Sequence, residues 1–120
     1  MDKEKIEKFI LKLIKATIDE VIEWDRIDYH PELINAKLVG TQYEGIFKEQ
    51  RMIILSIVYD NYEPYLDRHY KSEGHVLHLL DDEDNIEWEI FNTGDIGRLY
   101  NLAKFKSEKI DEKLDNLLSD

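Results

Sequence analysis

The stretch MIILSIVY, residues 52–59, is the most apolar run in the sequence. Eight residues are few for a helix, and this apolar, β-branched content is typical of a buried strand, so we predict that residues 52–59 form the central strand of a sheet. Residues 36–47 are rich in β-branched and aromatic side chains and predict a neighbouring strand, whose two glycines mark bulge or bend points. A polar turn is expected at 48–51. Residues 60–74 contain a proline, a glycine and many charges, which indicate a long loop or a frayed strand end.

A β-hairpin is predicted downstream of the central strand. Its strands are residues 75–80 and 86–90, and they flank an acidic turn at 81–85. Strict alternation in the second strand predicts one buried face and one wet face. The buried positions are Ile86, Trp88 and Ile90, and the wet positions are Glu87 and Glu89.

Amphipathic helices flank the strands. Residues 3–23 carry apolar side chains at spacings of three and four, which predicts an N-terminal helix. A C-terminal helix begins near Thr93 or Asp95, either of which is a suitable cap, and a break near 105–107 stays open. The order helix, four strands, helix contains no helical crossover. It predicts a single α+β domain over residues 1–120, a four-stranded antiparallel meander with both helices packed on one sheet face.

The composition restricts the classes of function. The chain of 120 residues has 27 acidic and 16 basic side chains and a net charge of −11. This charge repels phosphate backbones and anionic lipid, so we expect no direct nucleic-acid or membrane binding and favour a basic protein partner. Solubility alone is the simpler explanation of such a charge. The sequence has no cysteine, which excludes disulfides and thiolate sites, and no apolar run long enough to span a membrane. We therefore expect a cytoplasmic protein.

Motifs for catalysis are sparse. Residues 94–97 read GDIG and lack the rest of a phosphate-binding loop, and the four serines lie in no nucleophile motif. His69, His75 and His78 precede the acidic turn and are candidate metal ligands. On a strand, however, His75 and His78 point to opposite faces, since they are three positions apart. We therefore predict that the protein is not an enzyme and has no catalytic residue, no cofactor and no metal.

The acidic stretch 81–95 is the strongest local anomaly, because it has seven carboxylates and no basic residue. It lacks the glycine and glutamate positions of a calcium loop. One interpretation is a solvated turn. The other is a negative surface that docks on a basic partner, including as a nucleic-acid mimic. The candidate partner-binding residues are Asp81, Asp82, Glu83, Asp84, Glu87 and Glu89.

A cluster of tyrosines within residues 59–70 is interleaved with basic side chains. Tyrosines at a sheet edge most often pack with a wet hydroxyl, and they are also frequent in protein interfaces. A third interpretation is a nucleotide held by stacking and ion pairing. The candidate residues for that ligand are Tyr59, Tyr62, Arg68 and Lys71.

Several core segments carry a resemblance to known proteins. These are residues 13–17 leading into 22–24, and then 53–59, 86–90 and 99–103. In them the chain resembles a diffuse group of small, uncharacterised acidic proteins of low-GC Gram-positive bacteria and their phages and mobile elements. The resemblance implies the order of elements and an accessory protein of a phage or mobile element, and it transfers no activity. We expect a non-enzymatic protein-binding module that inhibits a host protein, such as a defence effector. A protein that sequesters a nucleotide signal and a homo-oligomer paired through the last helix are the alternatives.

Overall fold

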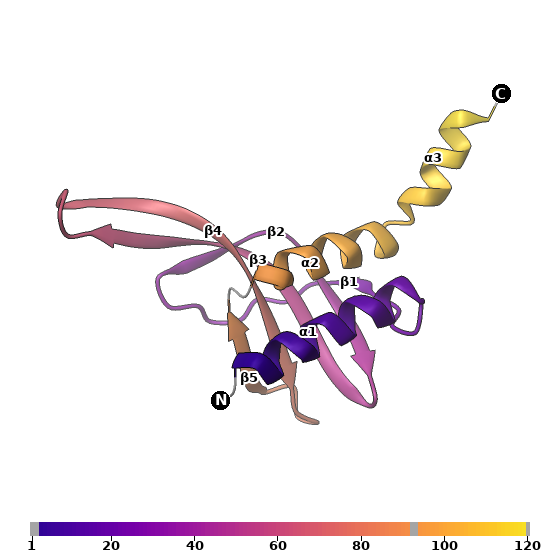
Figure 1. Ribbon diagram of the computed structural model, residues 1–120, viewed down its shortest axis with the longest axis horizontal. Helices are drawn as coiled ribbons and strands as arrows, with labels where there is room; N and C mark the ends of the chain where they lie inside the picture. The colour runs from indigo at the N-terminus through magenta and orange to yellow at the C-terminus, as the bar shows by residue number, and fades with distance from the viewer. Residues whose placement is uncertain (1–2, 92–93, 120) are drawn as a thin grey trace.

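The computed structural model describes residues 3–91 and 94–119, which form one antiparallel sheet and three helices (Figure 1). The helices are α1 (Lys3–Ile18), α2 (Gly94–Ser107) and α3 (Ile110–Leu118). The strands are β1 (Asp25–Ile27), β2 (Ala36–Phe47), β3 (Gln50–Glu63), β4 (Arg68–Leu80) and β5 (Ile86–Phe91). Each strand pairs antiparallel with the next in the order β1-β2-β3-β4-β5. The α+β class and the meander are confirmed, with five strands in the described chain where four were predicted.

Strand β3 lies at the centre of the sheet, as the apolar run predicted. Ile53, Ile54 and Leu55 are completely buried, because β2 and β4 flank the strand and both sheet faces are covered there. Its pairing with β4 runs without a register shift from Arg51 opposite Leu80 to the far end of both strands. Strands β3 and β4 therefore form the longest continuous pair in the sheet.

The two glycines of β2 serve different purposes. Gly40 has a φ of +69° and lies where the register between β2 and β3 shifts, so it permits a bulge that other residues resist. Gly45 lies under Trp24, and a Cβ there would be 2.8 Å from the indole ring. Trp24 is buried and donates from Nε1 to Oγ1 of Thr17 at 2.9 Å. The close approach at Gly45 thus seats the segment after α1 on the sheet.

Helices α1 and α2 cover one face of the sheet, which we call the helix-side face (Figure 1). They also pack on each other, so a single core joins both helices to β3, β4 and β5. Its buried members include Ile10, Leu13, Ile54, Leu77, Ile90, Ile96 and Leu99. The predicted packing of helices on one face holds for α1 and α2, whereas α3 extends away from the sheet.

The opposite face of the sheet carries the segment 28–35, and we call it the loop-side face. Alternate residues of β3 and β4 point to this face and form a second core with the segment. The buried members are Ile53, Leu55, Ile57, Val76 and Leu80, and the side chains packed on them include Tyr29 and Leu33. The segment between β1 and β2 therefore covers this face.

The end of the first helix differs from that predicted. Helix α1 ends at Ile18, where the sequence pattern continued to residue 23, because Glu20 adopts a left-handed φ of 60° that reverses the chain. The C-terminal helix does break close to the predicted stretch 105–107, because α2 ends at Ser107 and Lys109 adopts a left-handed φ of 52° before α3 begins. Within residues 3–91 and 94–119, no helix is both long and apolar enough to cross a membrane.

Two further predictions fall near these elements. The segment between the first helix and the first long strand, where no element was predicted, contains β1, which pairs with β2 through only three residues. A strand so short gives no periodic signal. Thr93, one of the two candidate caps of the C-terminal helix, lies outside the described residues, and Asp95 lies in the first turn of α2.

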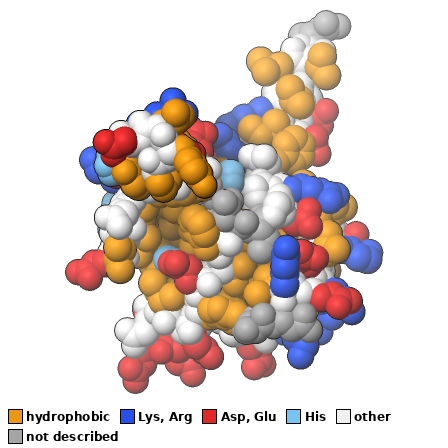
Figure 2. All heavy atoms as spheres, turned by 60° about the vertical axis from the view of Figure 1, so that its left-hand side comes forward, with side chains coloured by type: hydrophobic (Ala, Val, Ile, Leu, Met, Phe, Trp, Pro, Cys, Tyr) orange, Lys and Arg blue, Asp and Glu red, His pale blue; other side chains and the backbone are white. Residues whose placement is uncertain are grey.

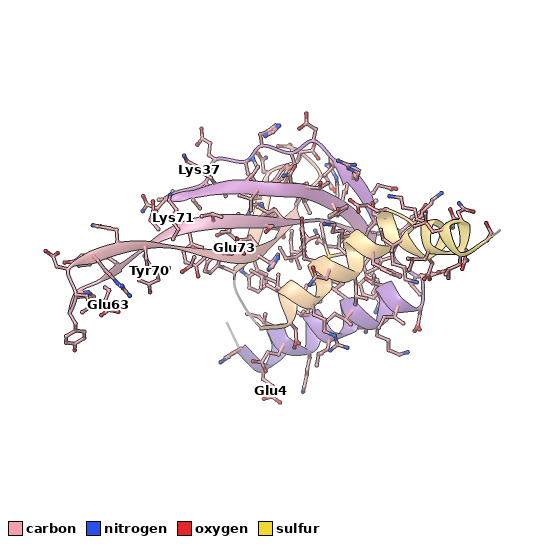
Figure 3. The ribbon with its side chains drawn as sticks, turned by 90° about the horizontal axis from the view of Figure 1, so that it is seen from above. Glu4, Lys37, Glu63, Tyr70, Lys71 and Glu73 are labelled. Atoms are coloured by element: carbon pink, nitrogen blue, oxygen red, sulfur yellow. The ribbon has the colours of Figure 1, made fainter. Side chains whose placement is uncertain are left out.

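A hairpin arm, residues 60–71, projects from the sheet (Figures 1 and 3). Its strands pair from Asp60 opposite Lys71 to Glu63 opposite Arg68, around a turn at 64–67. The arm and α3 give the molecule extents of 56 × 37 × 28 Å and a radius of gyration of 16.1 Å, against about 14 Å for a compact chain of this length. Of the two alternatives predicted for 60–74, the long loop is wrong, and the strand end is closer, although these ends of β3 and β4 are paired and not frayed. A ribbon that is wet on both faces leaves no alternating pattern in its sequence.

Candidate binding site on the loop-side face

A cavity of about 330 Å³ lies on the loop-side face at the base of the arm. Ile57 and Val76 from β3 and β4 contribute apolar surface, with Leu33 of the covering segment and Phe91 of β5 on either side. Figure 2 shows a hollow lined by hydrophobic side chains below the arm. This volume lies at the lower end of the range for ligand sites, so the cavity suits one small group or one side chain of a partner.

Two aromatic rings line the cavity. Tyr59 of β3 and Phe91 of β5 meet edge to face, with centroids 5.4 Å apart and an interplanar angle of 73°. Both side chains point to the loop-side face because Tyr59 follows the alternation of Ile57 and Phe91 lies opposite Val76. Nearly perpendicular rings offer a ligand one ring face and one ring edge.

Three acidic residues, Glu32, Asp60 and Glu89, line the cavity, and none of the described lining residues is basic. The alternation of β3 directs the side chain of Asp60 to the other face of the sheet, where Lys71 lies. Asp60 forms an ion pair with Lys71 at 3.4 Å, which offsets its charge. The side chain of Glu32 has no hydrogen bond or ion pair within the described chain and is exposed. The cavity is thus apolar with a net negative rim.

The carboxylate of Glu89 is held by a buried histidine. His78 of β4 is 0% exposed, and its Nε2 lies 2.7 Å from Oε2 of Glu89. Its other nitrogen, Nδ1, lies 2.8 Å from the hydroxyl of Tyr29. The chain Tyr29–His78–Glu89 therefore links the segment 28–35 to both β4 and β5.

The direction of these hydrogen bonds follows from the chemistry of the partners. A carboxylate only accepts, so Nε2 of His78 donates to Glu89, and in the neutral imidazole Nδ1 then accepts from Tyr29. Burial, and secondly the charge of Glu89, raise the pKa of Tyr29, which keeps its hydroxyl protonated as a donor. Since His78 is completely buried, it positions the loop and the carboxylate and does not itself reach a ligand.

The six predicted partner-binding residues in and after the acidic turn between β4 and β5 differ in their contacts. Oδ1 of Asp81 accepts hydrogen bonds from the backbone N–H groups of Glu83 and Asn85, both at 2.9 Å, so Asp81 shapes the turn. Asp84 forms an ion pair with Arg51. The side chains of three others are exposed and have no hydrogen bond or ion pair in the described chain, namely those of Asp82, Glu83 and Glu87. Glu89, the sixth residue, belongs to the cavity.

The four residues predicted to bind a nucleotide do not converge. Alternation along the arm puts Tyr59 and Arg68 on the loop-side face and Tyr62 and Lys71 on the other. Tyr62 donates to Asp67 at 2.7 Å, Lys71 pairs with Asp60, and only Tyr59 reaches the cavity. Figure 3 shows Lys71 nearer the base of the arm than Glu63.

The three histidines also separate. His78 is buried on the loop-side face, His69 lies beside Tyr62 on the arm with ring centroids 5.0 Å apart, and His75 packs against Tyr100 of α2 at 4.8 Å. Burial lowers the pKa of His75. No cluster of three or more metal-ligating side chains occurs within residues 3–91 and 94–119.

The sequence did not indicate Tyr29, the covering segment or the cavity. Tyr29 lies 49 positions from His78, and only the fold brings the two together. The one local signal was Pro31 after His30, which marked an extended connection without showing where it runs. Comparison with known protein families, curated proteins and solved structures found no match for the chain.

Proposed function

We propose that the protein is a non-enzymatic binding module that engages a partner protein through its arm and its loop-side face. The partner presents a basic surface, and the role we assign to the complex is inhibition of that host protein. The proposal is supported above all by the hairpin arm, an ordered ribbon that exposes large apolar side chains away from the core.

The exposed side chains of the arm are the kind that interfaces use. Tyr65 and Leu66 in its turn are 96% and 62% exposed, and Tyr62 and Tyr70 behind them are about half exposed. Aromatic residues are enriched in the buried centres of protein interfaces, and clustered exposed apolar groups mark interaction sites. In contrast, the apolar residues on the two faces of the sheet are already covered by α1, α2 and the segment 28–35.

Charge supports a basic partner. The net charge of −11 steers a positively charged surface towards the chain and repels nucleic acid. The free carboxylates of the acidic turn and the rim of the cavity lie on or beside the loop-side face. Electrostatic attraction of this kind raises the rate of association and selects the partner, while buried apolar contacts hold the complex.

The experiment is affinity capture with the tagged chain, comparing the native protein with Tyr65→Ser/Leu66→Ser. The matched control is Leu117→Ser/Leu118→Ser, which removes two exposed apolar side chains, 80% and 81% exposed, from α3. We expect a stoichiometric partner protein to bind the native chain and the α3 variant and to be lost from the arm variant. Equal capture by all three proteins contradicts the proposed use of the arm.

A second comparison tests the acidic turn. Asp82→Asn/Glu83→Gln/Glu87→Gln neutralises the carboxylates that have no structural partner and leaves the contacts of Asp81 and Asp84 intact. If charge only steers association, the variant binds the captured partner more slowly and with a weaker dependence on salt, while its dissociation rate is unchanged. A loss of binding through faster dissociation would instead make the turn part of the contact surface.

A further inference from the structure

We propose that the cavity on the loop-side face binds a basic side chain of the partner protein, arginine in preference to lysine. This inference rests on the proposed function, because it assigns the chemistry of one contact that the partner makes. It is carried by the lining of the cavity, which combines apolar surface, two aromatic rings and carboxylates without a basic residue among the described lining positions.

The charge of the cavity favours a cationic ligand. Asp60 is offset by Lys71 at 3.4 Å, but Glu32 has no partner among the described side chains. Glu89 uses only Oε2 for His78, and Oε1 has no hydrogen bond within the described chain. Two carboxylates thus face an apolar cavity with hydrogen-bonding capacity to spare. A cation with several N–H donors satisfies both, whereas an anionic ligand is repelled.

The aromatic pair in the cavity favours a flat cation. Tyr59 and Phe91 meet at 73°, so a flat cation that enters beside them lies over one ring and against the edge of the other. Guanidinium groups stack on aromatic faces and are more weakly hydrated than ammonium groups, which favours arginine over lysine here. The aliphatic part of the same side chain then covers Ile57 and Val76.

Hydrogen bonds within the protein preorganise the cavity. The hydrogen bond from His78 fixes the carboxylate of Glu89, and the bond from Tyr29 to His78 fixes the segment that forms the facing wall. A site whose carboxylate and wall are held before the ligand arrives loses less entropy on binding. The volume of about 330 Å³ admits one long side chain.

The test is an NMR titration of the full ¹⁵N-labelled chain with two capped tripeptides, acetyl-Gly-Arg-Gly-amide and its citrulline counterpart. Citrulline keeps the shape of arginine and lacks the charge. We expect the arginine peptide to shift the amide signals of Ile57, Val76 and Phe91 in a saturable way, and the citrulline peptide to leave them unchanged. Free agmatine, which carries a guanidinium group without a peptide backbone, is titrated separately.

Variants connect the signal to the cavity. Glu89→Gln removes the charge but keeps an oxygen that accepts from His78, and we expect it to weaken binding of the arginine peptide about fivefold. Glu87→Gln is the matched control, since it neutralises an exposed carboxylate two residues away on β5 that lies outside the cavity. Tyr59→Leu should also weaken binding, whereas Tyr62→Leu, on the other face of the arm, should not.

Each outcome decides the inference. Shifts that spread over the acidic turn, equal responses to arginine and citrulline, or equal affinity of the Glu89 and Glu87 variants overturn it. Agmatine binding more tightly than the peptide overturns the assignment to a protein side chain and makes the ligand a free guanidinium compound. Absence of cavity shifts while the arm variant still loses its captured partner overturns this inference alone. If the arginine peptide binds in the cavity but the arm variant captures the partner as well as the native chain does, the proposed function alone is overturned.

Discussion

Removing one hydroxyl group by Tyr29→Phe is expected to destabilise the protein by about 1–3 kcal/mol, because it leaves Nδ1 of the buried His78 without a donor. Water cannot replace the lost partner directly, since the histidine is 0% exposed. For a chain of 120 residues the entropy of unfolding is about 250 cal/mol/K, so a loss of about 2 kcal/mol lowers Tm by about 8 °C.

A double-mutant cycle isolates the hydrogen bond. His78→Leu removes both ring nitrogens, after which the Tyr29 hydroxyl turns to water and the half-exposed Glu89 stays solvated. The double variant should therefore lose less stability than the sum of the single variants, by about 1–2 kcal/mol. Tyr62→Phe is the control, because that hydroxyl donates to Asp67 in full contact with solvent, and its removal should leave the midpoint unchanged.

The assay is urea unfolding followed by the fluorescence of the buried Trp24. Coincident transitions by circular dichroism establish that unfolding is two-state. The reasoning is refuted if Tyr29→Phe behaves like Tyr62→Phe, or if the two substitutions in the cycle are strictly additive. Either result would mean that the segment 28–35 is not tied to β4 in solution and that the cavity has no fixed wall.

Three other predictions concern stability. Gly45→Ala should destabilise by about 1–3 kcal/mol because its Cβ meets Trp24 at 2.8 Å, whereas Gly94→Ala, which meets nothing within 4 Å, should leave the urea midpoint unchanged. Burial lowers the pKa of His75, so this histidine binds a proton more readily in the unfolded chain than in the folded protein. The free energy of unfolding should therefore fall as the pH drops below about 6.5, and it should fall less in His75→Gln. Urea midpoints measured from pH 7.5 to 5 check this prediction. Burial and the hydrogen bond to Glu108 raise the pKa of Tyr43 to about 12. The stability that its protonated hydroxyl supplies is therefore complete below about pH 10 and should be lost between about pH 10 and 12. Tyr43→Phe should reduce this loss, and tyrosinate absorbance measured in the same titration reports when the tyrosines ionise.

The sequence predicted the fold where burial imposes a pattern. The run at 52–59 marked the central strand because both of its faces are covered, and the alternation at 86–90 marked a strand with one wet face. Ile86, predicted to be buried, is instead 43% exposed, because the pairing of β4 with β5 is irregular beside it. The arm and β1 were missed for the opposite reason. The arm buries neither face, so its charges and Pro64 resembled a loop, and three residues of β1 are too few for any period. The first helix ends earlier than predicted because left-handed Glu20 stops it where the apolar spacing continues.

The candidate site was less accessible to sequence reasoning. Of the six acidic residues proposed for the partner, Glu89 alone lines the cavity, and of the four proposed for a ligand, Tyr59 alone does. A cavity depends on which side chains the chain reversals bring together. Here the segment 28–35 crosses the sheet and places Tyr29 beside a histidine 49 positions away. Local spacing does not indicate that contact: His78 was considered only as a metal ligand, and Tyr29 was not considered at all.

The independence of the arm from the cores has a consequence for how the protein can change over generations. Residues 61–70 are paired with each other and belong to neither buried cluster. Substitutions in these residues therefore have little effect on the stability of the domain, whereas substitutions in the parts of β3 and β4 that lie in the sheet affect it strongly. Selection for a new partner can therefore change the tip of the arm while the sheet and helices change slowly. Related chains should consequently differ most at the tip of the arm, which is farthest from the core.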